Sequence, residues 1–223
     1  LKVSKFAASE SPSKLYLEAG TSISVEDAVM ALIVKSANDV ATVVAENISG
    51  TEKEFAKLMT SYARKLGMNK TTFKNAHGLP DRAQMTTARD IATLSNALIE
   101  NFPNEYKLFS KTKFVWKNKT YKTHNKLMLS YEGADGIKTG YIRASGFQLA
   151  FSAVRKNKRL IGVYFGGDTG KQRNASLAFL MDRSFKKLKI EKTNNQKTII
   201  SKKTDNNTFK NKYIVVVGTF KYK

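Results

Sequence analysis

The spacing of apolar residues changes once along this chain. In the first hundred residues it follows the period of an α-helix, and after residue 113 apolar and polar residues alternate over short stretches, as in β-strands. A long helical pattern then returns between residues 171 and 188. Helices first, then strands, then one helix predict an α+β body in which an antiparallel sheet packs against helices.

The helical part contains amphipathic segments with recognisable ends. Apolar residues repeat at helical spacing over 25–34, 55–66 and 91–98, and Gly67 supplies a stop after the second segment. Thr87 followed by Asp90 resembles a capping box before the third segment, which ends ahead of Pro103. We expect these apolar stripes to form core, and we assign them no function.

Two hairpins are predicted in the strand-forming part. Residues 113–117 and 120–123 alternate around Asn118 and Lys119, and the more apolar segments 147–155 and 158–166 flank a turn at Lys156 and Asn157. The predicted helix over 171–188 follows the second hairpin.

Composition excludes several kinds of site. Cysteine is absent, so neither a disulfide nor a thiol nucleophile is available. The only histidines, His77 and His124, have no partner at metal-ligand spacing, so we expect no metal and no other cofactor. No apolar run is long enough for a transmembrane helix, and the first residues do not resemble a signal peptide.

The net charge of +21 admits two interpretations. It indicates an anionic partner such as nucleic acid, an acidic membrane face or an acidic wall polymer, or it reflects lysines spread over solvated surfaces. Of the 39 basic residues 31 are lysine, whereas surfaces that bind phosphate rely more on arginine interleaved with aromatic residues. We favour the solvated surface and expect no nucleic-acid partner.

Polar residues between two apolar helical stretches indicate a turn whose side chains face a cleft. Ser36 and Asn38 in this turn form an S-x-N element, and a K-T-G element, residues 138–140, precedes the second hairpin. A serine hydroxyl beside a lysine can relay a proton to and from a nucleophile, and the Asn38 amide can hold a substrate backbone.

The K-T-G element offers groups that suit a peptide with a free carboxylate. Lys138 brings positive charge near a reacting carbonyl, and the hydroxyl of Thr139 can bind a carboxylate. Gly140 lets a peptide lie close along the strand, and the backbone N–H of Tyr141 can donate to an oxyanion.

Together these elements resemble the low-molecular-weight penicillin-binding proteins, specifically the D-alanyl-D-alanine carboxypeptidases. The order and spacing of the similar stretches cover residues 1–187. These stretches are Ser36-Ala37-Asn38-Asp39, Asn75-Ala76-His77-Gly78-Leu79, Thr87-Ala88-Arg89-Asp90, Pro103-Asn104-Glu105-Tyr106, Asn125-Lys126-Leu127, residues 133–141, Ala144-Ser145-Gly146-Phe147, Gly166-Gly167 and Arg173.

The resemblance implies a penicillin-binding/β-lactamase-like fold, with an antiparallel sheet flanked by helices plus an all-α lobe, incomplete at the N-terminus. It implies serine-type removal of the terminal D-Ala from peptidoglycan pentapeptide stems in the periplasm or cell envelope, through an acyl-enzyme. β-Lactam antibiotics would acylate the intact protein.

The resemblance also assigns roles to individual residues. It makes Ser36 and Asn38 catalytic, and it makes Lys138, Thr139, Gly140 and Tyr141 substrate-binding. Arg173 matches the family's basic residue beside the carboxylate pocket, an exposed helix arginine being the alternative. His77 is expected to be structural. Ile142 stands where the family has threonine, which leaves substrate preference open.

The family's Ser-x-x-Lys nucleophile motif is expected about thirty residues before Leu1, so the chain is expected to be a fragment that is inactive alone. Residues 11–14 do read Ser-Pro-Ser-Lys, but a turn followed by a strand is predicted there rather than the helical turn that places lysine beside serine. Ser11 is therefore not the expected nucleophile.

Two other functions share part of this pattern. A serine β-lactamase requires S-D-N and a loop glutamate, but Ala37 occupies the middle position and no such loop is evident. A non-catalytic peptidoglycan-binding fragment of a split gene remains the alternative to the enzyme.

Three parts are predicted along the chain. Residues 1–187 form the partial peptidase domain and residues 188–211 a basic polar linker. Residues 212–223 resemble the first strand of a truncated SPOR-like domain, a module that binds glycan strands and that the linker would tether.

Overall fold

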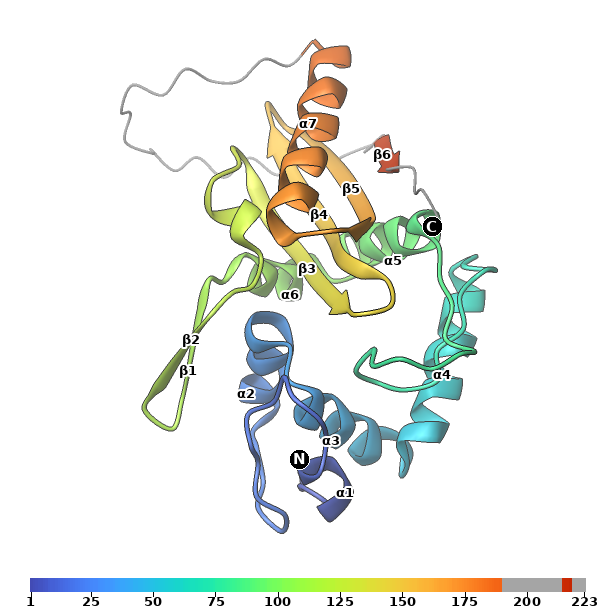
Figure 1. Ribbon diagram of the computed structural model, residues 1–223, viewed down its shortest axis with the longest axis vertical. Coiled ribbons are helices and arrows are strands. Elements are labelled where there is room, and N and C mark those ends of the chain that lie inside the picture. The colour runs from blue at the N-terminus through green and yellow to red at the C-terminus, as the bar shows by residue number, and fades with distance from the viewer. Residues whose placement is uncertain (190–213, 218–223) are drawn as a thin grey trace.

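The computed structural model describes residues 1–189 and the backbone of residues 214–217, and it has two lobes (Figure 1). A helical lobe holds the first part of the chain, and a sheet lobe holds the rest. The predicted α+β, penicillin-binding-like architecture is confirmed. The linker over 188–211 and the SPOR-like segment over 212–223 lie almost entirely outside the described residues.

The helical lobe is built from short helices with polar caps. Its elements are α1 (Lys5–Ala8), α2 (Val25–Met30), the π-helical turn η1 (Ala31–Lys35), α3 (Asn38–Ser49) and α4 (Glu52–Lys65). The side chains of Ser24 and Thr51 accept backbone N–H groups at the starts of α2 and α4, which satisfies donors that a helix leaves free. The apolar faces of α2, η1 and α3 meet in one core together with Val3, Leu15 and Leu17.

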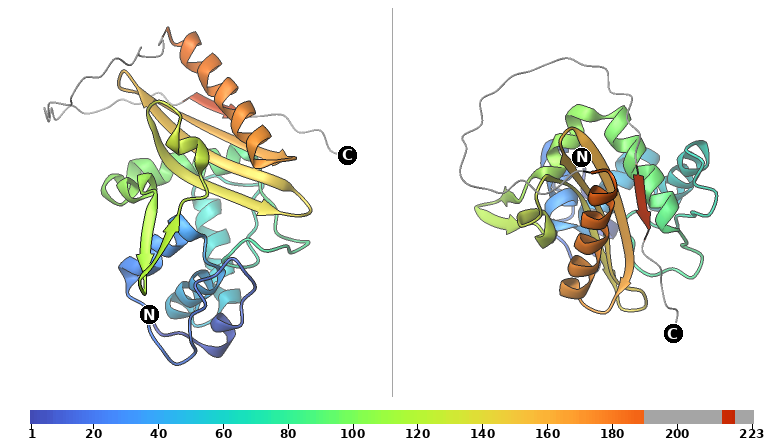
Figure 2. Two further views of the ribbon diagram at one scale, coloured as in Figure 1. Left: turned by 60° about the vertical axis from the view of Figure 1, so that its left-hand side comes forward. Right: turned by 90° about the horizontal axis from the view of Figure 1, so that it is seen from above.

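The sheet lobe is a four-stranded sheet between helices. Strands β3 (Ala134–Ile142), β4 (Gly146–Arg155) and β5 (Lys158–Gly167) are antiparallel neighbours, and β6 (Ile214–Val217) lies parallel beside β5. Helix α7 (Gly170–Lys187) covers one face of this sheet, and α5 (Ala88–Asn101) covers the other (Figure 2). Because β3 is the first strand in the sheet order, its outer edge has no strand neighbour among the described residues.

Short elements connect the two lobes. They are α6 (Pro103–Tyr106), η2 (Lys107–Ser110), the hairpin of β1 (Lys113–Trp116) and β2 (Lys119–Lys122), and η3 (Lys126–Leu129). The hairpin extends from the sheet lobe along α2 (Figure 1). None of the described helices combines the length and the apolar character needed to cross a bilayer.

Local detail departs from the sequence prediction at two places. The first hairpin turns at Lys117 and Asn118, one residue earlier than predicted, because both residues adopt the positive φ angles that a tight two-residue turn requires. Thr87 caps α5 as predicted, but the Asp90 carboxylate binds Lys70 N and Thr71 Oγ1 instead of completing a capping box. The second turn, at Lys156 and Asn157, is confirmed.

The buried carboxylate of Asp39 holds the N-terminal segment onto α3. Its oxygens accept the backbone N–H groups of Leu15 and Leu17 at 3.0–3.1 Å, and that of Val40 at 2.9 Å. The Asp39 residue is fully buried, so no water can replace these bonds.

Replacing Asp39 with alanine should therefore lower the free energy of unfolding by about 2–5 kcal/mol, because buried N–H groups lose their acceptor. Chemical denaturation monitored by circular dichroism measures the change. The exposed Asp81, which accepts only the nearby Ala83 N–H, is the matched control, and Asp81→Ala should cost much less. Equal effects of the two substitutions would contradict this role for Asp39.

Candidate active site

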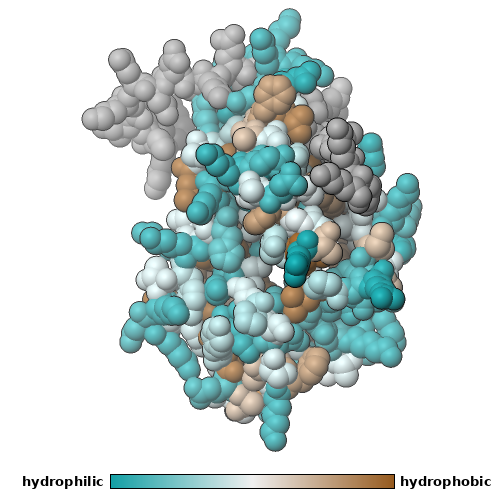
Figure 3. Space-filling model, in the orientation of Figure 1, coloured by the Kyte–Doolittle hydropathy of each residue, from teal (hydrophilic) through white to brown (hydrophobic). Residues whose placement is uncertain are grey.

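A cleft of about 1080 Å³ lies where the helical lobe meets the sheet lobe. It opens as a hollow on the face seen in Figure 3. The S-x-N turn lines one side of it, and the K-T-G strand with the start of α7 lines the other. All seven residues predicted to act in the site contribute to its wall; they are Ser36, Asn38, Lys138, Thr139, Gly140, Tyr141 and Arg173.

Ser36 is placed by an unusual helix end. The π-helical turn η1 stops at Ser36, whose φ of 57° is left-handed and reverses the chain before α3 begins. Such a conformation is costly for a residue other than glycine and is often found at functional sites. It directs a short polar side chain out of a helical core and toward the sheet.

Lys138 reaches Ser36 across the cleft. Its Nζ donates to Ser36 Oγ at 2.8 Å and to the carbonyl of Thr139 at 3.0 Å, although 102 positions separate the lysine from Ser36. Burial lowers the pKa of Lys138 from 10.5 to about 8, because a charged amine loses hydration there. A lysine in this condition can exchange a proton with the serine near neutral pH.

The outer edge of β3 forms the upper rim of the cleft. Gly140 and Tyr141 are exposed there, and the Tyr141 ring packs on Phe147 with 4.4 Å between ring centroids. An edge strand without a neighbour can accept an extended peptide as a further strand. Ile142 also lines the cleft, next to this aromatic pair.

Arg173 is buried at the start of α7 rather than exposed on it. Its guanidinium donates to the Gln148 carbonyl at 2.9 Å and to Asn174 Oδ1 at 2.8 Å. Burial lowers the pKa of Arg173 from its ordinary value. Within residues 1–189, neither Arg173 nor Lys138 forms an ion pair with a carboxylate.

The sequence matches a known family. A family model described as D-alanyl-D-alanine carboxypeptidase matches residues 1–169. The chain belongs to this family. DacF of Bacillus subtilis (strain 168) is 34% identical over 193 residues, and DacD of Escherichia coli (strain K12) is 37% identical over 162 residues; both are D-alanyl-D-alanine carboxypeptidases.

Solved structures of this carboxypeptidase family share the fold. DacD from Francisella tularensis superposes with a TM-score of 0.77 at 29% identity and covers 80% of this chain, and penicillin-binding protein 5 from Haemophilus influenzae gives 0.74 at 30% identity and 82% coverage. The match covers 49% of DacF, 42% of E. coli DacD and 56% and 55% of the two crystallised chains. The chain thus spans about half the length of these relatives.

Asn38 binds the N-terminal segment at the bottom of the cleft. Its Nδ2 donates to the carbonyl of Ser11 at 2.9 Å, and its backbone N–H donates to the carbonyl of Ser13 at 2.7 Å. Its amide therefore fixes the segment that contains the Ser-x-x-K match. In that segment Lys14 Nζ donates to Ala8 O and lies over the Tyr16 ring. Within the described residues the Lys14 amine is thus bonded away from Ser11, and the two do not form a nucleophile pair.

His77 lies at the other side of the floor with two carboxylates. Its Nε2 is 3.2 Å from Glu52 and 3.5 Å from Glu10, and the ligand atoms of the three side chains lie within 4.8 Å of one another. The Nδ1 atom, however, accepts the Leu79 N–H, so in the neutral ring Nε2 carries the proton and donates to the carboxylates. This bonding suits a structural link rather than a metal site.

Sequence reasoning missed several cleft residues. His124 comes from the loop after β2, Lys126 from the start of η3, Gln148 from β4, and Ser13 from the N-terminal segment. Partial burial and the charges of Lys138 and Lys35 lower the pKa of His124. The one sequence feature that could have placed His124 in the cleft is its position just before the Asn125-Lys126-Leu127 stretch.

The lowered pKa of Lys138 predicts that the free energy of unfolding increases with pH. Between the folded value of about 8 and the ordinary 10.5, the unfolded chain holds a proton that the folded chain has released. The unfolding free energy of the wild type, relative to Lys138→Met, should therefore rise with pH over this interval, by up to about 3 kcal/mol.

Urea denaturation at several pH values measures this difference. Lys186→Met removes an exposed amine from α7 and should show no comparable trend. A difference between wild type and Lys138→Met that stays constant from pH 8 to 10.5 would contradict a lowered pKa of the Lys138 amine.

Proposed function

We propose that this chain forms the substrate-holding part of a serine-type D-Ala-D-Ala carboxypeptidase that trims peptidoglycan pentapeptide stems in the cell envelope. The observation that supports it most is a pair of cations, the partly buried Lys138 and the buried Arg173, lining one cleft without a carboxylate partner among the described residues. Buried charges are costly unless paired, so the cleft favours an anionic ligand. The terminal carboxylate of a D-Ala-D-Ala peptide supplies that charge.

The peptide would lie along the outer edge of β3 as an extra strand. Gly140 has no side chain to keep it away, and Thr139 with Arg173 would bind its carboxylate. The scissile carbonyl would then face Lys138 and Ser36, and the Tyr141 N–H would donate to its oxygen as negative charge develops.

Ser36 is proposed as a proton relay rather than as the nucleophile. Its hydroxyl accepts a hydrogen bond from Lys138, and both groups can pass a proton to the departing D-Ala amine. The nucleophile in this proposal is a serine of a Ser-x-x-Lys motif outside the sequence described, and Asn38 would orient the substrate backbone and the lysine of that motif. β-Lactams would acylate the same serine; one solved relative, penicillin-binding protein D2 from Listeria monocytogenes, is in its ampicillin-bound form.

A binding measurement tests the carboxylate pocket. A fluorescent peptide ending in D-Ala-D-Ala should bind the chain, and Arg173→Leu should weaken binding about 10- to 100-fold, because a charge-assisted hydrogen bond is lost. Arg173→Lys keeps the charge and should recover part of the affinity. The exposed Arg183 on α7 is the matched control, and Arg183→Leu should leave the affinity unchanged.

The same peptide with a C-terminal amide should bind as weakly to wild type as the free acid binds to Arg173→Leu. Equal affinity of the acid and the amide for wild type would contradict a carboxylate site. Melting curves of each variant verify that the fold is retained.

A labelling experiment tests the assignment of the nucleophile. Incubation of the chain with a fluorescent penicillin should leave no covalent label at Ser11, since the amine of Lys14 donates to Ala8 O instead. Peptide mapping by mass spectrometry locates any adduct, and a label on Ser11 would show the assignment to be wrong. Binding of D-Ala-D-Ala peptides without any adduct is also what the non-catalytic alternative predicts, so turnover by the longer protein separates the two.

A further inference from the structure

The β1–β2 hairpin and the loop after it carry an unusual concentration of positive charge. Residues 111–126 contain six lysines and no aspartate or glutamate. All six are exposed. They are Lys111, Lys113, Lys117, Lys119, Lys122 and Lys126, and we call them the hairpin lysines.

The hairpin places two of these charges directly opposite each other. Lys113 pairs with Lys122 in the strand register, where side chains on the same face lie about 5 Å apart at their Cβ atoms. Like charges in this position destabilise a hairpin. An anion bound between them would relieve that repulsion.

The rest of the described molecule does not neutralise the hairpin lysines. A few other basic side chains in residues 1–189 do have carboxylate partners; Arg155 pairs with Asp182 and Arg159 pairs with Asp135. None of the hairpin lysines forms such an ion pair within the same residues. The positive electrostatic potential of the hairpin lysines therefore extends into solvent.

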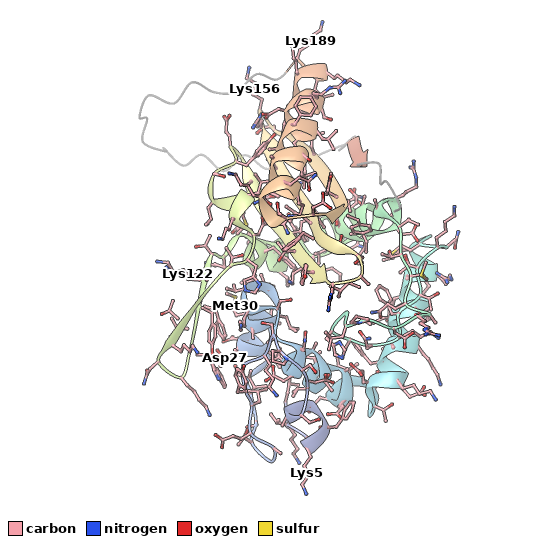
Figure 4. All side chains as sticks on the ribbon, in the orientation of Figure 1. Lys5, Asp27, Met30, Lys122, Lys156 and Lys189 are labelled. Atoms are coloured by element: carbon pink, nitrogen blue, oxygen red, sulfur yellow. The ribbon has the colours of Figure 1, made fainter. Side chains whose placement is uncertain are left out.

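The hairpin turns its aromatic side chains inward, whereas Lys113 and Lys122 lie on the opposite, outward face; Lys117 and Lys119 lie at its end, over the rings of Trp116 and Tyr121. Phe114 is buried in the core of the helical lobe, and Trp116 and Tyr121 pack partly against it. Lys122 projects outward at the edge of the molecule in Figure 4. The outward face thus presents amines around a single exposed apolar residue, Val115.

The hairpin adjoins the cleft. The Tyr121 ring lies 5.7 Å from Nζ of Lys35, the residue just before Ser36, and the chain after β2 leads directly to His124 and Lys126 in the cleft wall. The cleft wall itself includes cations but no aspartate or glutamate among the described residues. Positive charge therefore runs from the hairpin into the cleft.

We propose that the hairpin lysines bind acidic groups of the substrate chain that lie beyond the D-Ala-D-Ala end held in the cleft. The preferred ligand is a peptide or peptide-bearing polymer with several carboxylates, a preference that rests on the proposed function. Nucleic acid fits less well, because the aromatic rings that would stack on bases face inward. A lipid surface fits less well, because Val115 is the one apolar residue on the described outward face.

Two fluorescent peptides ending in D-Ala-D-Ala test this proposal. One carries two glutamates upstream, and the other has glutamines in their place. Wild type should bind the acidic peptide more tightly, and Lys113→Gln/Lys122→Gln should weaken binding of that peptide about three- to tenfold while leaving the neutral peptide unchanged. The matched control, Lys186→Gln/Lys187→Gln, removes the same charge from the exposed end of α7 and should change neither affinity.

The outcomes separate this proposal from the proposed function. Binding of the neutral peptide reports on the cleft alone, so its loss would count against the cleft and not against the hairpin. Equal affinity of wild type and the hairpin variant for the acidic peptide would overturn the proposal. It would also be overturned if the hairpin substitutions weakened binding to phosphatidylglycerol vesicles or to duplex DNA but not to the acidic peptide.

Discussion

The contact between Lys138 and Ser36 is the interaction on which the site depends. It joins the sheet lobe to the helical lobe, and it brings together groups that are 102 positions apart. Each partner needs its own local structure: the serine requires the left-handed end of η1, and the lysine requires the edge position of β3. With either displaced, the cleft would lose the pair that we propose as the proton relay.

Two positive charges in the cleft lose part of their hydration, which costs free energy of folding and favours an anionic ligand. The amine of Lys138 and the guanidinium of Arg173 lose hydration in the cleft, and the folded chain provides no carboxylate for them among the described residues. In the proposed function a ligand carboxylate would restore the missing interaction, so that substrate binding would also stabilise the fold. Within residues 1–189 the hairpin lysines are also cations without a carboxylate partner, and they would favour an anionic ligand. They lie at the surface, where water screens each charge, so each lysine contributes less to binding.

Local signals in the sequence predicted much of the fold. Apolar periodicity gave the helices and the strand pairs, and Lys156 and Asn157 marked a turn that the structure confirms. The family motifs gave all the predicted cleft residues. What could not be predicted depends on long-range contacts: the bond from Asn38 to Ser11, the place of His124 beside Lys138, and the parallel pairing of β6 with β5. The apolar periodicity of a sequence predicts local elements but not which distant segments come into contact.

A double-mutant cycle on Ser36 and Lys138 tests the central contact most directly. The unfolding free energies of wild type, Ser36→Ala, Lys138→Met and the double variant are measured by urea denaturation at pH 7. A hydrogen bond between the two side chains predicts a coupling energy of about 1–3 kcal/mol. Effects of the two substitutions that add within about 0.3 kcal/mol would show that the two lobes do not meet through this pair.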